Sequence, residues 1–220
     1  MKPKRILLIR HGESEGNVNK GMYGQKPDYA LLLSDKGKQQ ARDAGVRLRK
    51  IVGDETLRFY VSPLFRTRQT FQEVASAFLE TQFASQEEPR LREQEWGHLR
   101  GLDECMAVDK DRDAYGTFYF RIPDGESAAD VFDRVSDFFS TLFRDFEKPN
   151  FPQNAVMVTH GMTIRLFLMR WFHYTVEEFE RLANLENCAI VFLELQQNGR
   201  YRLMTEMPTH RVEHQWRLDV

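Results

Sequence analysis

The chain has 220 residues, of which 41% are hydrophobic and 29% are charged, and its formal net charge at pH 7 is −2. These values are ordinary for a soluble globular protein with one sizeable core, and they leave no basic footprint for nucleic acid or an anionic membrane. No apolar run reaches the length of a membrane span, and 2 cysteines give no disulfide framework, so we expect a cytoplasmic protein.

The first predicted element is a buried strand over residues 6–9, and Arg10-His11-Gly12 follows it directly. Strand ends of open α/β sheets are where such folds bind ligands. A histidine beside a fixed positive charge suits attack on an anionic electrophile such as a phosphoryl group. Asn17 lies a little further on, where it could steady a phosphate or orient His11, with a simple turn residue as the alternative.

Helices and strands are predicted to alternate along the rest of the chain. Ser34 and Ser127 are suitable helix caps, and the apolar patterns predict helices over residues 35–50, 67–79, 128–146 and 163–172. Strands are predicted over residues 57–61, 155–158, 188–195 and 201–204, the last two joined by the turn signal Asn198-Gly199. This alternation predicts an α/β fold, a three-layer α/β/α sandwich around a mostly parallel central sheet.

We expect one domain over residues 1–220, with two segments that depart from this rhythm. Residues 96–123 form an insertion, and loops of that length are usually functional or disordered. Residues 208–220 are polar and are expected to form a surface tail or an interface strap, and a homodimer stays open. His210 and His214 have the spacing of metal ligands on a helix, but no third ligand is evident, so a solvated tail is the preferred interpretation.

Three predicted strands end in residues that could hold a phosphate. Arg10 and His11 follow the first strand, Arg66 lies shortly after the second, and His160 and Gly161 follow the third. Because the carboxyl ends of parallel strands meet at one edge of a sheet, we expect two arginines and two histidines to converge on one cleft.

Several motifs occur in the order seen in a known family. They are Arg10-His11-Gly12, Ser62-Pro63-x-x-Arg66, Leu91-Arg92-Glu93 and Thr159-His160-Gly161, with smaller matches at Leu33-Ser34-x-x-Gly37-x-x-Gln40-Ala41 and Pro123-x-Gly125-Glu126-Ser127. This ordered set resembles the histidine phosphatase superfamily, branch 1, over roughly residues 5–195. The resemblance implies a phosphoglycerate mutase-like fold in which residues 96–123 cover the active site.

The expected roles combine the residue chemistry with this resemblance. His11 is the expected nucleophile, because a neutral imidazole can attack phosphorus and form a phosphohistidine, and nearby arginines should lower its pKa. Arg10 and Arg66 are the expected clamp for the phosphoryl oxygens, and His160 is expected to donate to the same oxygens. The alternatives are fold-supporting histidines, and arginines that cap a helix or pair with Glu73.

Glu93 is the expected general acid, because a leaving alkoxide needs a proton and a carboxyl in a dry pocket can hold one near neutral pH. Glu95 is its local rival, and a solvated surface charge is the alternative for either. Tyr23 and Gly24 are expected on the substrate side of the site, whereas Arg68 is expected to point elsewhere. Five further residues are candidates for lining the substrate side, and a position in the core is the alternative for the aromatic ones. They are Tyr115, Phe118, Tyr119, Phe120 and Arg121.

The resembled family contains both mutases and phosphatases. Those mutases bring a lysine and two arginines from the covering segment, whereas residues 101–104 and 109–113 here carry several acids that would repel a doubly anionic substrate. We therefore expect a phosphatase for small organic phosphate esters that uses no metal and no cofactor. A cofactor-dependent phosphoglycerate mutase or bisphosphatase is the first alternative. A non-catalytic phosphate-binding or interaction module is the second, and the filled catalytic positions argue against it.

Overall fold

The computed structural model describes residues 2–98 and 101–210, in which a six-stranded sheet has the order β3-β2-β4-β1-β5-β6. Its parallel part consists of β1 (Arg5–Arg10), β2 (Leu57–Val61), β3 (Phe83–Glu87) and β4 (Asn154–Thr159). Two further strands run antiparallel at one side, β5 (Ile190–Leu195) beside β1 and β6 (Tyr201–Leu203) beside β5. The mostly parallel sheet predicted from the sequence is confirmed.

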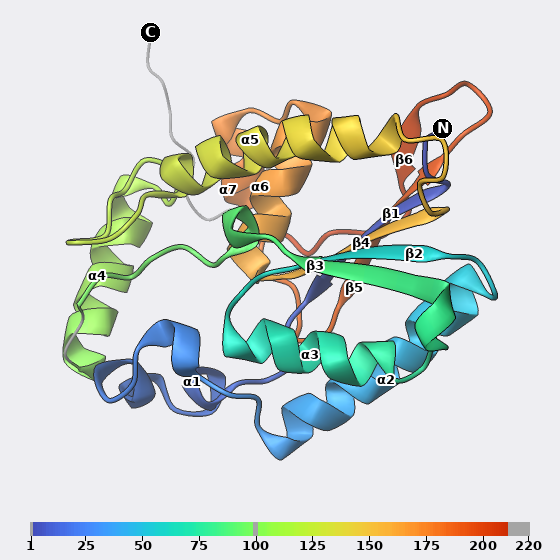
Figure 1. Cartoon of the computed structure of the whole chain (residues 1–220). Coiled ribbons are helices and arrows are strands. Elements are labelled where there is room, and N and C mark those ends of the chain that lie inside the picture. The colour runs from blue at the N-terminus through green and yellow to red at the C-terminus, as the bar shows by residue number, and fades with distance from the viewer. Residues whose placement is uncertain (1, 99–100, 211–220) are drawn as a thin grey trace, which may run out of the picture.

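Helices cover both faces of the sheet, as Figure 1 shows. On one face lie α2 (Asp35–Val52) and α3 (Phe65–Ala75), and on the other lie α5 (Ala128–Phe146) and α6 (Gly161–Phe172). The alternation of side chains along β1 explains the two cores, because successive residues of a strand point to opposite faces. Leu7 and Ile9 therefore join the core under α2 and α3, whereas Ile6 and Leu8 join the core under α5 and α6.

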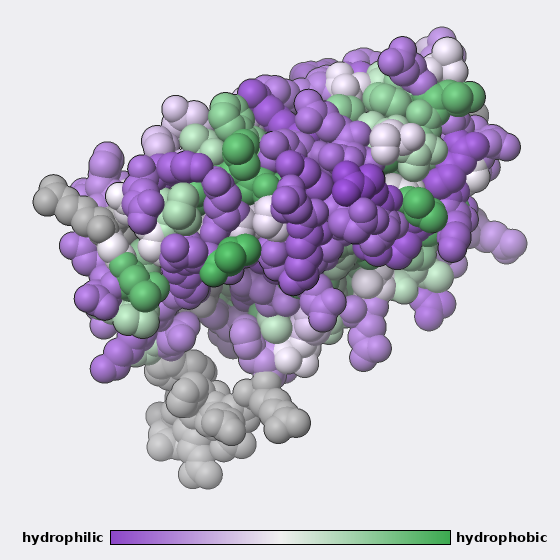
Figure 2. Space-filling view, turned by 90° about the horizontal axis from the view of Figure 1, so that it is seen from below, coloured by the Kyte–Doolittle hydropathy of each residue, from purple (hydrophilic) through white to green (hydrophobic). Residues whose placement is uncertain are grey.

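The two expected helix caps are present. The Ser34 hydroxyl accepts from the backbone N–H of Gly37 at 3.0 Å, and the Ser127 hydroxyl accepts from that of Asp130 at 3.2 Å. The outer face of α2 is polar, and the face of the molecule seen from below is mostly hydrophilic with small separate apolar groups (Figure 2). No helix among the described residues combines the length and the apolar character that crossing a membrane requires.

Two helices begin earlier than the sequence predicts, and both differences matter for the site. Helix α3 begins at Phe65 and ends at Ala75, so Arg66 lies in its first turn. Helix α6 begins at Gly161, so His160 is its N-cap residue. The strand predicted from residue 188 begins instead at Ile190, because Cys188 has a φ of 58° and interrupts the extended backbone.

Several elements were absent from the prediction. Strand β3 is an edge strand whose residues are mostly polar, and α4 (Leu102–Tyr115) has Cys105 as its single buried residue, so neither shows an apolar pattern. The other unpredicted elements are short: α1 (Glu15–Val18), α7 (Val176–Arg181), η1 (Lys20–Gly24), η2 (Asp28–Ala30), η3 (Glu80–Gln82) and η4 (Pro89–Leu91).

The start of the predicted tail packs against α7. Thr209 forms an isolated β-bridge with Leu182, and the backbone N–H of His210 donates to the Arg181 carbonyl at 2.9 Å. His214 and the remainder of the predicted tail lie outside the described residues.

Candidate active site

Two buried histidines lie side by side at the carboxyl edge of the sheet. His11 follows β1 and His160 follows β4, and these neighbouring strands pair in a register that sets Arg10 opposite Thr159. The ring centroids of the two histidines are 5.2 Å apart, with an interplanar angle of 60°. The strand register alone therefore brings together two residues that are far apart in the sequence.

The orientation of the His11 ring is set by its own loop. Nδ1 lies 2.8 Å from the Gly12 carbonyl oxygen, which can only accept, so Nδ1 carries the hydrogen and Nε2 keeps its lone pair. Burial, followed by the charges of Arg66 and Arg10, holds the pKa of His11 well below its usual value. The lowered pKa agrees with the sequence-based expectation, and the ring is neutral near pH 7.

His160 contacts a different partner. Its Nε2 lies 2.8 Å from the Ser62 hydroxyl, which can donate or accept. Its Nδ1 is buried, has no hydrogen-bond partner among the described residues, and lies 3.9 Å from Oε2 of Glu93. Burial, Arg66 and His11 hold the pKa of His160 well below its usual value, so this imidazole is also neutral. The contact between Ser62 and His160 was not predicted, although Ser62 belongs to the motif Ser62-Pro63-x-x-Arg66.

Arg66 is buried, with 2% of its side chain exposed. Its guanidinium binds Asp28 of η2, donating from Nη1 to Oδ1 at 2.9 Å and from Nη2 to Oδ2 at 3.1 Å. The suggested alternative pairing with Glu73 is wrong, because Glu73 binds Arg42. No local signal in the sequence links Asp28 to Arg66, since the contact depends on how η2 folds over α3.

Arg10 and Gly161 lie close together. Arg10 donates from Nη1 to the Leu185 carbonyl, and its buried Nε has no partner among the described residues. A Cβ on Gly161 would lie 2.8 Å from Oδ1 of Asn184 and 3.7 Å from the Arg10 Nε, so glycine permits this close approach. Arg68 points away, as expected, and pairs with Glu87 at 2.8 Å.

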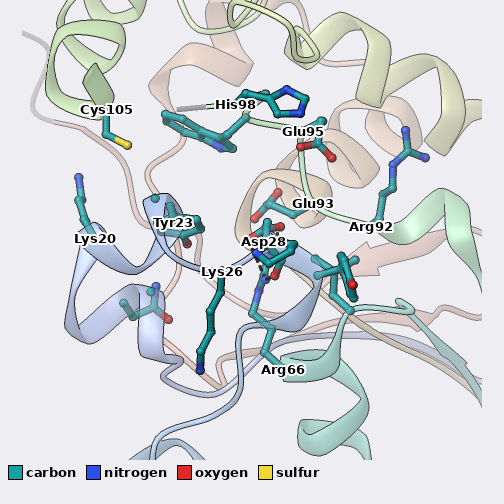
Figure 3. A pocket seen from close by; sticks show the side chains of 18 of the residues that line it. Lys20, Tyr23, Lys26, Asp28, Arg66, Arg92, Glu93, Glu95, His98 and Cys105 are labelled. Atoms are coloured by element: carbon teal, nitrogen blue, oxygen red, sulfur yellow. Dashed lines mark hydrogen bonds and ion pairs between the residues drawn. The ribbon is translucent and has the colours of Figure 1, made fainter. Parts of the chain in front are cut away.

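A cavity of about 1160 Å³ opens in front of these residues. The predicted site residues that line it are Arg10, His11, Asn17, Tyr23, Gly24, Arg66 and Glu93, together with the rival Glu95, whereas His160, whose ring lies beside that of His11, and Gly161 are not among its lining residues. Figure 3 shows Glu93, Asp28 and Arg66 grouped at its centre, with Lys20 and Tyr23 to one side. Burial raises the pKa of Glu93, although the charge of Arg66 opposes this, and burial raises that of Tyr23 to about 12.

The Asn17 side chain is held by hydrogen bonds to Ser14 and Asn187. Its side-chain oxygen accepts from the backbone N–H of Ser14 at 3.1 Å and from the Asn187 amide at 3.2 Å. The Asn187 amide also donates to the His11 carbonyl at 3.1 Å. Asn17 therefore completes the capping box of α1, whose N-cap is Ser14. It is connected to the His11 backbone through Asn187, which no sequence motif indicated.

The covering segment contributes different residues from those predicted. The aromatic run and Arg121 do not line the cavity: Phe118 packs in the core against Phe132 and Phe179, and Arg121 pairs with Asp130. The residues within 96–123 that do line it are Trp96, Gly97, His98, Cys105, Asp109 and Arg112. Helix α4 thus brings an arginine as well as an acid to the cavity, whereas the sequence argument weighed only the several acids of this segment.

Two cationic side chains, Lys20 and Arg112, share the carboxylate of Asp109. Asp109 pairs with Arg112 of the same helix and with Lys20 of η1, both at 3.3 Å. The Arg112 guanidinium also lies 4.9 Å from the centroid of the Trp96 ring. These contacts join α4 to η1, and Lys20, Asp109 and Arg112 all line the cavity.

With this fold and this arrangement of histidines and arginines established, comparison with known proteins identifies the class. The model of the histidine phosphatase superfamily (branch 1) matches residues 6–206, and the chain belongs to this family. The resemblance inferred from the ordered motifs is therefore confirmed.

Individual relatives include both mutase-like proteins and phosphatases. The chain is 42% identical over 217 residues to the phosphoglycerate mutase-like protein AT74H of Arabidopsis thaliana, covering 91% of this chain and 77% of the relative. It is 31% identical over 301 residues to the broad-range acid phosphatase DET1 of Saccharomyces cerevisiae, covering 94% and 90%. A mycobacterial glucosyl-3-phosphoglycerate phosphatase solved with VO3 has a TM-score of 0.74 at 25% identity, covering 93% and 99%. The family and these phosphatases support an enzyme that acts on phosphate esters.

Proposed function

We propose that the protein is a phosphomonoesterase that hydrolyses small organic phosphates through a phosphohistidine on His11. The observation that carries this proposal is the state of the His11 ring. Its Nδ1 is bound to the Gly12 carbonyl, its lowered pKa keeps it neutral, and Arg10 and Arg66 stand close enough to depress that pKa. A neutral imidazole with a free Nε2 lone pair beside two guanidinium groups is suited to attack a phosphoryl group.

In the first step, the His11 Nε2 lone pair forms a bond to phosphorus while the ester P–O bond breaks. The leaving oxygen takes the proton of the Glu93 carboxyl, whose raised pKa favours the protonated acid that this step requires. Arg10 and Arg66 donate to the phosphoryl oxygens, where charge accumulates. If the Ser62 hydroxyl donates to Nε2 of His160, the hydrogen of that ring is on Nδ1, and a phosphoryl oxygen would supply its missing partner.

In the second step, water attacks phosphorus and the P–N bond to His11 breaks. The Glu93 carboxylate takes a proton from that water, inorganic phosphate leaves, and both residues return to their starting states. The positive charge that this chemistry needs is supplied by Arg10 and Arg66, so the proposal includes activity without a metal ion.

A cofactor-dependent phosphoglycerate mutase or bisphosphatase is the second candidate, and one observation favours it. Nε of Arg112 is buried without a hydrogen-bond partner among the described residues, and Arg112 lines the cavity. A second anionic group of a substrate could use that nitrogen. Hydrolysis stays the preferred function because Asp109 already contacts both Arg112 and Lys20, which reduces their attraction for a further anion.

The experiment is phosphate release from p-nitrophenyl phosphate and from alkyl phosphates by purified protein in excess EDTA. We expect turnover that survives chelation and that the substitution His11→Ala abolishes. Isomerisation of 3-phosphoglycerate in the presence of 2,3-bisphosphoglycerate, at a rate equal to or above hydrolysis, would establish the second candidate. Phosphate binding without turnover of any ester would indicate a non-catalytic module.

A further inference from the structure

Glu93 lies in a segment without regular structure, directly after η4. One half-buried arginine of α5, Arg134, holds the backbone of that segment. Arg134 donates from Nη1 to the carbonyl oxygens of Arg90 at 2.7 Å and Arg92 at 2.8 Å, and from Nη2 to the carbonyl oxygen of Glu93 at 3.0 Å. Three carbonyl groups within four residues of chain are thus bound to one planar group.

Glu126 holds the guanidinium in place. Arg134 donates from Nε to Oε1 of Glu126 at 3.1 Å and from Nη2 to Oε2 at 3.0 Å. The same carboxylate accepts from the Arg92 guanidinium at 2.6 Å and from the backbone N–H of Glu95 at 3.0 Å. The residues on both sides of Glu93 are therefore attached to the Arg134–Glu126 pair.

The five hydrogen bonds of Arg134 match its five N–H donors, so none is left for a substrate. Arg134 does not line the cavity, and 11% of its side chain is exposed. Buried ion pairs contribute little net stability because desolvation opposes their attraction. The hydrogen-bond pattern says more about the role of Arg134 than the ion pair does. The planar guanidinium fixes the positions of three carbonyl groups, and a flexible lysine with three donors cannot reproduce this.

We propose that Arg134 is a positioning residue for the general acid, because its guanidinium fixes the backbone from which the Glu93 carboxyl reaches the leaving oxygen. This inference rests on the proposed function of Glu93. Arg134 acts through Glu93 and does not touch the reacting atoms. Its loss should therefore impair proton donation to the leaving group and spare the attack of His11 on phosphorus.

The leaving group separates this role from a merely structural one. p-Nitrophenolate leaves as a stable anion and needs little help from an acid, whereas an alkoxide must be protonated. The experiment measures kcat/KM, which covers steps up to departure of the leaving group, for p-nitrophenyl phosphate and for an alkyl phosphate. For Glu93→Gln we expect a loss of about 100-fold on the alkyl ester and a far smaller loss on the aryl ester. Arg134→Lys should show the same selectivity, with at least about tenfold loss on the alkyl ester and about twofold on the aryl ester.

Two further variants keep the experiment decisive. Arg165→Lys is the matched control, because Arg165 is buried and likewise donates to a backbone carbonyl, that of Phe179, at 3.3 Å. It should lower the melting temperature while leaving the ratio of the two kcat/KM values unchanged. If Arg134→Lys does not fold, Thr163→Val removes a single bond to the Arg92 carbonyl, of 3.1 Å, and should shift the ratio in the same direction.

The outcomes distinguish the inference from the function on which it rests. An equal loss on both esters for Glu93→Gln would contradict the role of Glu93 as acid. A selective loss for Glu93→Gln combined with an equal loss on both esters for Arg134→Lys would leave that role intact and overturn the inference.

Discussion

The Asp28 carboxylate receives both ends of the Arg66 fork, with Nη1 at 2.9 Å from one oxygen and Nη2 at 3.1 Å from the other. The Asp28 carboxylate thus binds the two Arg66 nitrogens in the bidentate geometry in which a guanidinium also binds a phosphoryl group. An acid of the protein and the substrate would compete for the same arginine. The Asp28 carboxylate would also be a like charge beside a phosphoryl group bound by Arg66.

Asp28→Asn removes that charge and one strong acceptor of Arg66. We expect inorganic phosphate to inhibit the variant at about fivefold lower concentration, equivalent to about 1 kcal/mol of binding free energy. The measurement is the competitive inhibition constant of phosphate with p-nitrophenyl phosphate as substrate. An unchanged or weaker inhibition would show that Asp28 does not oppose anion binding.

The pH dependence of kcat/KM on an alkyl phosphate follows from two pKa shifts of opposite sign. His11 must be neutral, and burial and the two arginines lower its pKa, so activity should persist well below pH 6.5 and fall only under the lowered pKa. Glu93 must be protonated, and burial raises its pKa, so activity should fall as pH rises above that value. An acidic-to-neutral optimum is expected. In Glu93→Gln the alkaline decline should disappear, and a wild-type maximum above about pH 8 would contradict this assignment.

Gly12 is packed too closely for a side chain. A Cβ there would lie 2.4 Å from the Gly37 carbonyl oxygen, so Gly12→Ala must displace backbone next to His11. We expect a loss of about 1–3 kcal/mol in the free energy of unfolding, with a lower melting temperature and weaker activity. Gly101→Ala is the control, because a Cβ there meets no atom of the described residues within 4 Å. Gly101 is the N-cap of α4, so its substitution should cost clearly less stability than Gly12→Ala and leave the activity unchanged. Equal stability of the two variants would refute the packing argument.

Asp109 is expected to limit binding of substrates with a second negative charge. Asp109→Asn removes the carboxylate that contacts both Lys20 and Arg112. Such partly exposed ion pairs contribute about 0–1 kcal/mol, so KM for a phosphate ester that also carries a carboxylate should fall up to about fivefold. KM for p-nitrophenyl phosphate, measured in parallel, should stay constant. An identical effect on both substrates would argue against a role of Asp109 in charge selection.

The parts of the site that strands position could be predicted from the sequence. Apolar runs that stop at His11 and at His160 indicate two strand ends, and the rule that parallel strands share one carboxyl edge then places these residues together. The pairing of β1 with β4 agrees with that reasoning. The caps Ser34 and Ser127 were also predictable, because a helix cap depends on residues within one turn.

The missed features depend on contacts between distant segments. Asp28 reaches Arg66 only after η2 folds over α3. Arg134 of α5 reaches the Glu93 carbonyl across a sequence separation of 41 residues. Helix α4 lacks an apolar stripe because it lies over the cavity and buries only Cys105. Arg121 was therefore named as a candidate for the substrate side and Arg112 was not, since periodicity gave no indication of which face of the segment points inward.

The most direct test of the central claim is to trap the covalent intermediate. The protein is mixed with a 32P-labelled phosphate ester, quenched in alkali, where phosphohistidine is stable, and digested for peptide mapping. We predict acid-labile label on the peptide that contains His11, and none in His11→Asn under the same conditions. Turnover of the ester by the wild-type protein with no label on His11, or with label on another residue, would contradict the account.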